Sequence, residues 1–236
     1  METHIRSTKP DLAHTPTIAD WANQNRQKLV FAVSALLVLI LVVVGSVLIY
    51  NTRSASAQQQ FDAAMRTYES PVASPGQPLP PGTKSFSSDA EKAKQANSEF
   101  SVVADKYGMT SAGRNAKYMA GVTAAESGQT ATAEKTLKEV ASGWNGDTSS
   151  LANLALAHLY RQSGRDADAI AIYKHLSEKP TTVVPAGLAQ MQLADLYEAE
   201  NKPAEAKKIY AQLKDKDAKS AAGEMAAQKL SGAPVQ

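Results

Sequence analysis

The segment LAHLYRQSGRDADAIAIYKHL at residues 156–176 has two counterparts in the same chain: AGVTAAESGQTATAEKTLKEV at residues 120–140 and LADLYEAENKPAEAKKIYAQL at residues 193–213. The three segments start 36 and then 37 residues apart. Each has glycine or alanine at its second position, alanine 12 residues later, and leucine or tyrosine four residues after that. Self-similarity at such a period is typical of arrays in which one small unit stacks on the next. The sequence therefore predicts a repeat array.

Each unit has the pattern of two helices joined by a tight turn. Gly128, Gly164 and Asn201 stand at the same offset in the three units, and these residue types end helices because they adopt positive φ readily. The small residues suit positions where two helices cross closely. Since no strand-like alternation follows the apolar segment of residues 29–50, we expect an all-α fold. A generic helical bundle with a chance periodicity is the alternative.

The second and third units resemble the tetratricopeptide repeat. In that family the first helix carries a Leu-Gly/Ala pair followed by a Tyr. The second helix carries an Ala that stands four residues before an aromatic residue. The first unit departs from the pattern, because Ala120 and Ala124 occupy the Leu and Tyr positions. The resemblance implies antiparallel helix pairs stacked into an α-superhelix over residues 89–231, closed by a capping helix near Met225. The matching residues are Leu156, Ala157, Tyr160, Ala169, Tyr173 and Leu176, and then Leu193, Ala194, Tyr197, Ala206, Tyr210 and Leu213.

A long apolar segment precedes the repeats. Residues 29–50, LVFAVSALLVLILVVVGSVLIY, carry no charge and would reach about 33 Å as a helix. A bilayer hydrocarbon core is about 30 Å thick, so this segment predicts one transmembrane helix in contact with lipid. Arg26 and Lys28 precede it, whereas Arg53 alone follows it before Arg66. The positive-inside rule therefore predicts residues 1–28 as a cytoplasmic tail and the repeats on the other side.

A cleaved signal peptide is the rival interpretation of this segment. The run Ala55-Ser56-Ala57 fits a cleavage site, but signal peptides have apolar regions of only about 7–15 residues. We therefore expect the anchor to be retained. Residues 51–88 combine a helix-forming part, which we expect to prolong the membrane helix, with a linker of five prolines at residues 70–88.

Composition excludes several kinds of function. A net charge of +2 and an aromatic content of 6% give no basis for nucleic-acid binding. The chain has no cysteine, which excludes disulfides, thiolate metal sites and cysteine nucleophiles. The four histidines lack metal-ligand spacing, and residues 108–113 lack the Lys and Ser/Thr of a phosphate loop. We expect a protein that is not an enzyme and that needs no metal or cofactor.

The inner face of the array is the candidate binding surface. Inward sites here hold Val122, His158 and Asp195, so a Lys/Asn clamp for a peptide carboxylate is not expected. An inner face that is only solvated, or that packs on the protein's own N-terminal helix, is the alternative. In repeats of this family, helix geometry directs inward Asn115, Tyr118, Leu151, Leu154, His158, Arg161, Leu188, Met191, Asp195 and Glu198.

The order of the segments is similar to that of the bacterial membrane-anchored ancillary subunit of the Sec translocon. The similarity rests on residues 21–26 before the membrane segment and on residues 93–107 after it, and the Pro-rich linker departs from it. It implies a single-pass protein of the bacterial inner membrane with a periplasmic repeat domain. Its partners would be translocon components, secretory clients or chaperones. An envelope scaffold for cell-wall synthesis or division is the alternative function.

Overall fold

The computed structural model describes residues 21–23, 25–73 and 85–232. Within these residues every named element is a helix, and the one β feature is an isolated bridge between Val72 and Phe86. The expected all-α fold is confirmed. Much of the expected tail and of the Pro-rich linker lies outside the described residues. The helices are α2 (Arg26–Tyr68), α3 (Asp89–Tyr107), α4 (Ser111–Glu126), α5 (Thr130–Ala141), α6 (Gly146–Gln162), α7 (Asp166–Glu178), α8 (Ala186–Ala199), α9 (Pro203–Lys216) and α10 (Ala221–Ser231).

The chain divides into two compact units, residues 1–51 and 52–236. In the first unit, α2 carries an apolar stretch that is long enough to cross a membrane. None of this stretch is buried inside the protein, unlike the core helix of a soluble domain. Helix α2 continues without a break to Tyr68, so Ala55-Ser56-Ala57 lies within regular helix.

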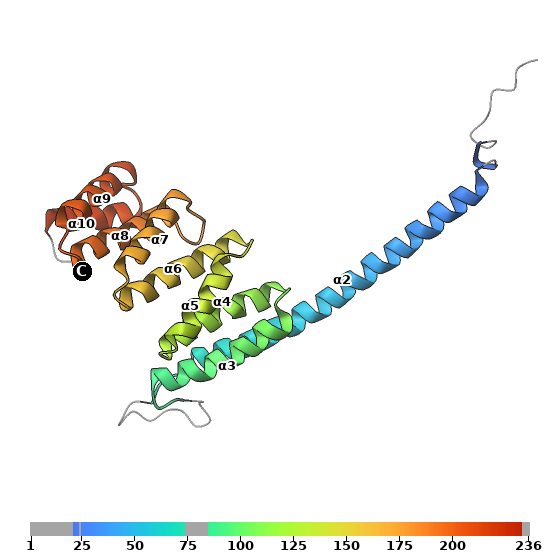
Figure 1. Cartoon of the computed structure of the whole chain (residues 1–236), viewed down its shortest axis with the longest axis horizontal. Coiled ribbons are helices and arrows are strands. Elements are labelled where there is room, and N and C mark those ends of the chain that lie inside the picture. Colours follow the sequence, from blue (N-terminus) through green and yellow to red (C-terminus); the bar gives the residue numbers. More distant parts are fainter. Residues whose placement is uncertain (1–20, 24, 74–84, 233–236) are drawn as a thin grey trace, which may run out of the picture. The chain divides into compact units, whose positions relative to one another are not determined.

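The second unit is the repeat array. Helices α3 to α10 follow one another in chain order (Figure 1), and each packs on its sequence neighbours. Helix α4 also contacts α6, and α8 also contacts α10. The first helices of the first two repeats are therefore in contact, and the first helix of the last repeat contacts the capping helix.

The last part of α2 forms a helical hairpin with α3 at the start of the array. The Phe61 and Phe100 rings lie 5.6 Å apart between centroids, and Gln60 donates a hydrogen bond to the Tyr107 hydroxyl at 2.8 Å. Near the start of this stretch, Arg53 donates to the Lys106 carbonyl at 3.2 Å. Residues 52–68 thus share a core with α3 and α4.

The three turns inside the repeats have one geometry. Gly128, Gly164 and Asn201 have φ values of 79°, 71° and 59°, as their positions in the sequence predicted. In each turn the amide of the next residue donates to a carbonyl five residues earlier, at 2.8 Å. Asn201 adopts this positive φ although it has a side chain. Asparagine adopts such values more readily than most other residues with a side chain.

Close helix approach explains the small residues of the pattern. Ala157, Ala169 and Ala206 are completely buried. Gly121 takes the place of Ala157 in the first unit, and a Cβ atom there would lie 2.7 Å from Leu137 Cδ2. The spacing between helices is therefore set by side chains no larger than a methyl group.

The Ala169→Leu substitution should reduce the stability of the unit formed by residues 52–236. Its larger side chain has no space in the α6–α7 crossing, and such overpacking costs about 1–3 kcal/mol. The measurement is the thermal unfolding midpoint of this unit. Ala171→Leu is the matched control, because Ala171 lies on the same helix and is exposed. Equal midpoints for the two variants would contradict the register assigned to α7.

Candidate protein-binding groove

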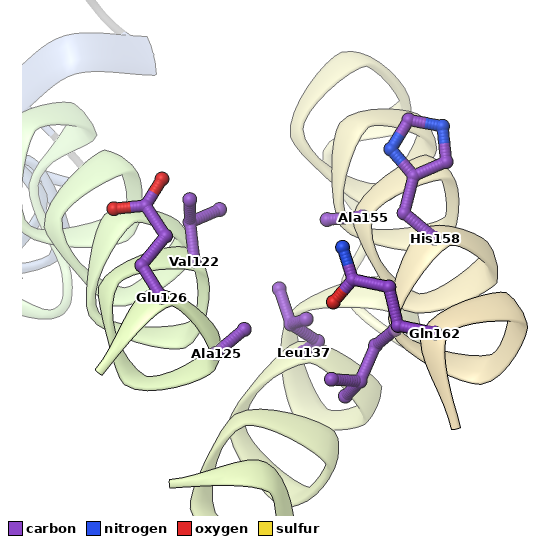
Figure 2. Close-up of a pocket in the computed structure, with 8 residues that line it drawn as sticks. Val122, Ala125, Glu126, Leu137, Ala155, His158 and Gln162 are labelled. Atoms are coloured by element: carbon purple, nitrogen blue, oxygen red, sulfur yellow. The ribbon is translucent and has the colours of Figure 1, made fainter. Parts of the chain in front are cut away.

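A cavity opens between the first helices of two successive repeats. Its volume is about 210 Å³, and α5 closes it from below through Leu137 (Figure 2). Helix α4 contributes Val122 and Glu126 on one side, and α6 contributes Ala155 and His158 on the other. The lining is completed by Ala125, Leu159 and Gln162. The cavity thus has an apolar floor and polar groups at its margins.

A second cavity continues along α6 toward α8. Its lining consists of His158, Arg161, Gln162 and Gln192. His158 and Gln162 line both cavities, so the two adjoin. We call the surface formed by these two cavities on α4, α6 and α8 the inner groove.

The residues expected on the inner face lie in different surroundings. His158 and Arg161 line the inner groove. Leu151 and Leu154 are half-buried and pack against a small core around Val184. Tyr118 is also half-buried and packs against the main core of the array, while Leu188 and Asn115 are exposed.

Met191 does not lie on an open surface. It is 4% exposed and packs with Ala206, Tyr210 and Leu213 in the core of the last repeat. The expectation of an accessible Met191 therefore needs correction. The reason is the capping helix α10, which belongs to the same core through Ala226 and covers this end of the array.

Asp195 and Glu198 bind the capping helix. Lys229 of α10 donates to Asp195 Oδ1 at 3.1 Å and to Glu198 Oε2 at 2.9 Å. The Tyr210 hydroxyl donates to Asp195 at 3.0 Å. These contacts, first among them the hydrogen bond to Glu198, raise the pKa of Lys229. Both carboxylates thus contact α10, and their side chains keep 33% and 42% of their surface exposed.

Sequence reasoning left out several residues of the inner groove. Glu126 and Gln162 are separated by the 36-residue period and occupy equivalent helix positions, and Ala155 and Gln192 are related by the 37-residue period. Glu126 and Gln162 lie inside the aligned segments, and extending the alignment by one residue upstream adds Ala155 and Gln192. Lys229 had no such signal, because α10 has no second helix and lies outside the alignment.

His158 has an unusual environment. Its side chain reaches the surface, yet partial burial of the ring lowers its pKa, and a hydrogen bond with Gln192 opposes this effect. The imidazole is therefore neutral at pH 7 and can both donate and accept a hydrogen bond. Its ring lies 6.1 Å from the Tyr173 ring between centroids. His158 and Asp195 occupy equivalent positions in successive repeats, and so do Tyr173 and Tyr210. The Tyr210 hydroxyl donates a hydrogen bond to Asp195. The buried Tyr173 hydroxyl, in contrast, makes no hydrogen bond among the described residues.

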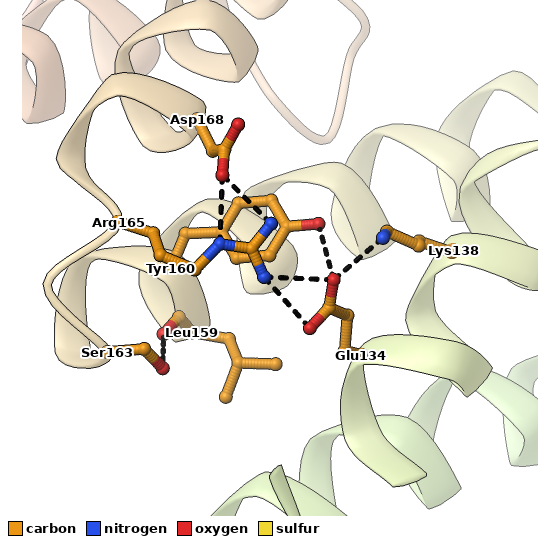
Figure 3. Close-up of polar contacts among 7 residues, drawn as sticks. All are labelled: Glu134, Lys138, Leu159, Tyr160, Ser163, Arg165 and Asp168. Carbon is orange, nitrogen blue, oxygen red and sulfur yellow. Dashed lines mark hydrogen bonds and ion pairs between the residues drawn. The ribbon is translucent and has the colours of Figure 1, made fainter. Parts of the chain in front are cut away.

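An ionic network connects the first repeat to the second. Glu134 on α5 accepts hydrogen bonds from Lys138 at 2.7 Å, from Arg165 at 3.0 Å and from the Tyr160 hydroxyl at 3.1 Å (Figure 3). Arg165 also pairs with Asp168, and its guanidinium lies 4.0 Å from the centre of the Tyr160 ring. These contacts lower the pKa of Glu134 to about 2, with the Lys138 hydrogen bond as the largest cause.

Comparison with known proteins identifies the repeats. A family model described as a tetratricopeptide repeat-like domain matches residues 21–233. The matched range includes the apolar stretch as well as every helix from α2 to α10. Searches among curated proteins and among solved structures found no match. Among the described residues, no group of three or more His, Asp or Glu side chains could hold a metal ion.

The Glu134 network predicts a pH-dependent coupling between repeats. Because the folded protein lowers the pKa of Glu134, the network stabilises the fold fully above the ordinary value of 4.5, and this contribution is lost as pH falls toward about 2. Glu134→Gln should therefore lower the unfolding midpoint at pH 7, and the difference from the wild type should shrink below pH 4.5. Thermal unfolding across this range is the measurement. Glu178→Gln, at an exposed position of α7, is the control and should show no such convergence.

Proposed function

Because the match over residues 21–233 shows that the chain belongs to the tetratricopeptide repeat-like family, we propose that it is a membrane-anchored scaffold whose inner groove binds segments of other proteins. Domains of this family are generally non-catalytic and bind proteins or peptides. The proposal accordingly includes no catalytic residue, no cofactor and no nucleic-acid partner.

The observation that carries this proposal is the apolar floor of the inner groove. Val122, Ala155 and Leu137 surround space for an apolar side chain of a bound segment. Buried apolar anchors contribute most of the affinity at such surfaces. At the margins, Glu126, Gln162 and the neutral His158 supply hydrogen-bonding groups that can orient the main chain of the ligand.

The contact residues we propose follow from their surroundings. Residues that line the inner groove contact the ligand directly, and Leu188 extends the surface along α8. Tyr118, Leu151 and Leu154 support the groove from half-buried positions. Met191 is not retained, because it lies in the core of the last repeat. Asp195 and Glu198 are proposed as polar contacts at the α10 end of the surface, where each keeps part of its side chain exposed.

A charge in the cavity should abolish binding. Ala155→Glu puts a carboxylate among apolar side chains. Binding is measured by crosslinking of client segments to a photo-reactive residue at position 162. We expect this crosslinking to fall at least about tenfold. The matched control is Ala171→Glu, the same substitution at an exposed site of the same repeat. Circular dichroism should show equal helical content in both. Undiminished crosslinking in Ala155→Glu would exclude the groove as the binding site.

We propose that the first unit anchors the protein in a bilayer. In this proposal residues 1–28 form a cytoplasmic tail, residues 29–50 cross the membrane, residues 51–88 form a helix and a Pro-rich linker, and residues 89–231 form the periplasmic repeat domain. The unburied apolar stretch of α2 supports the anchor. The family match supports its retention, since the matched range starts at residue 21 and runs through this stretch.

The proposed location is the bacterial inner membrane near the Sec translocon. Support comes from the similarity of residues 21–26 and 93–107 to the ancillary translocon subunit family. The partners would be translocon components, secretory clients or chaperones. The second candidate function is an envelope scaffold for cell-wall synthesis or division, which the same array of repeats would also suit.

Crosslinking in intact cells distinguishes the two candidate functions. With the photo-reactive residue at position 162, mass spectrometry should find translocon subunits, secretory clients or periplasmic chaperones enriched. The control is the same residue at position 207 on the outer helix α9, where Lys207 is exposed. Enrichment of cell-wall synthesis or division proteins, together with septal fluorescence of a tagged protein, would favour the scaffold instead.

A further inference from the structure

The turns at the two edges of the array differ in character. The edge at which α4, α6, α8 and α10 begin, here called the near edge, consists of the turns at residues 108–110, 142–145, 179–185 and 217–220. The opposite edge, the far edge, includes the turns inside the repeats at residues 127–129, 163–165 and 200–202, as well as the segment that joins α2 to α3. The three turns inside the repeats read SGQ, SGR and ENK and contain no large apolar residue.

Three of the four near-edge turns expose a large apolar side chain. Met109 is 88% exposed, Trp144 is 82% exposed and Val183 is 40% exposed. A single exposed apolar residue on a protein surface is ordinary. Met109 and Trp144 stand on neighbouring near-edge turns, whereas the far-edge turns inside these repeats expose no large apolar side chain.

Met109 and Trp144 belong to one structured patch. Arg114 donates from Nη1 to the Met109 carbonyl at 2.9 Å, and its guanidinium lies 5.1 Å from the centre of the Trp144 ring. A cavity of about 210 Å³ between the two turns is lined by Gly108, Arg114, Lys117, Val140 and Trp144, among others. The patch therefore combines an apolar surface with two basic side chains, of which Lys117 also pairs with Glu139 at 2.7 Å.

The covalent chain limits how far this edge can lie from the apolar segment. Arg53 contacts the carbonyl of Lys106, close to the turn that carries Met109. Arg53 is three residues after Tyr50, the last residue of the apolar segment, and three residues span at most about 11 Å even when fully extended. This limit follows from the Arg53 hydrogen bond inside the second unit together with chain connectivity, and it leaves the orientation of the array open.

We propose that the near edge, through Met109 and Trp144, lies in the headgroup region of the bilayer from which α2 emerges. This inference rests on the proposed membrane anchor. Tryptophan favours the interface between hydrocarbon and water, because its ring is apolar and its N–H still finds a hydrogen-bond acceptor there. Arg114 and Lys117 supply charges that attract anionic lipid headgroups.

Fluorescence of the full chain in vesicles tests this proposal. The chain has two tryptophans, so Trp21→Phe leaves Trp144 as the only one. This variant is reconstituted into phosphatidylcholine–phosphatidylglycerol vesicles with and without brominated acyl chains. We expect the brominated lipids to reduce Trp144 emission. We also expect the emission maximum of Trp144 in vesicles to lie at a shorter wavelength than that of the same variant unfolded in denaturant without detergent. The matched control carries Trp21→Phe, Trp144→Phe and Gln129→Trp, which moves the sole tryptophan to an exposed far-edge position.

The outcomes separate the anchor from the edge contact. Quenching of Trp144 but not of the tryptophan at position 129 supports the proposal. If both proteins float with the vesicles and keep their helical content, but Trp144 is not quenched, the edge contact is wrong and the anchor stands. Equal quenching at both positions also overturns the edge contact. Failure of both proteins to float overturns the anchor and with it this inference.

Discussion

The close approach of paired helices is the constraint on which the array depends. Ala157, Ala169 and Ala206 are completely buried, and Gly121 leaves no room for even a methyl group beside Leu137. Because the backbones lie close together at these crossings, the large side chains beside them, such as Tyr173, become fully enclosed. Since each crossing recurs with the repeat period, one local packing solution builds the whole array.

The repetition of the backbone does not extend to the chemistry of the groove. His158 and Asp195 occupy equivalent positions, yet His158 lines the inner groove while Asp195 bonds to Tyr210 and Lys229. Position within a repeat thus determines which way a side chain faces, and the neighbouring helix determines which groups that side chain contacts. Function in such an array comes from the differences between repeats.

The two ends of the array are closed in different ways. At the C-terminal end, Ala226 of α10 joins the core, and Lys229 of the same helix forms ion pairs with Asp195 and Glu198. At the N-terminal end, Phe61 and its neighbours on α2 pack against α3, so the helix that carries the apolar segment also completes the first layer of the array. A stacked array needs such closure, since its terminal units would otherwise expose their apolar faces.

The sequence by itself determined the helical fold, the repeat period, the positive-φ turns at Gly128, Gly164 and Asn201, and the apolar segment, because each depends on local pattern and residue type. It also predicted that His158 and Arg161 face inward, because the helix period fixes their direction. Only the tertiary structure decided that Met191 is buried and that Asp195 and Glu198 bind Lys229. These outcomes depend on α10, whose single helix has no counterpart in the repeat alignment, and contacts between residues more than 30 positions apart leave no local pattern in the sequence.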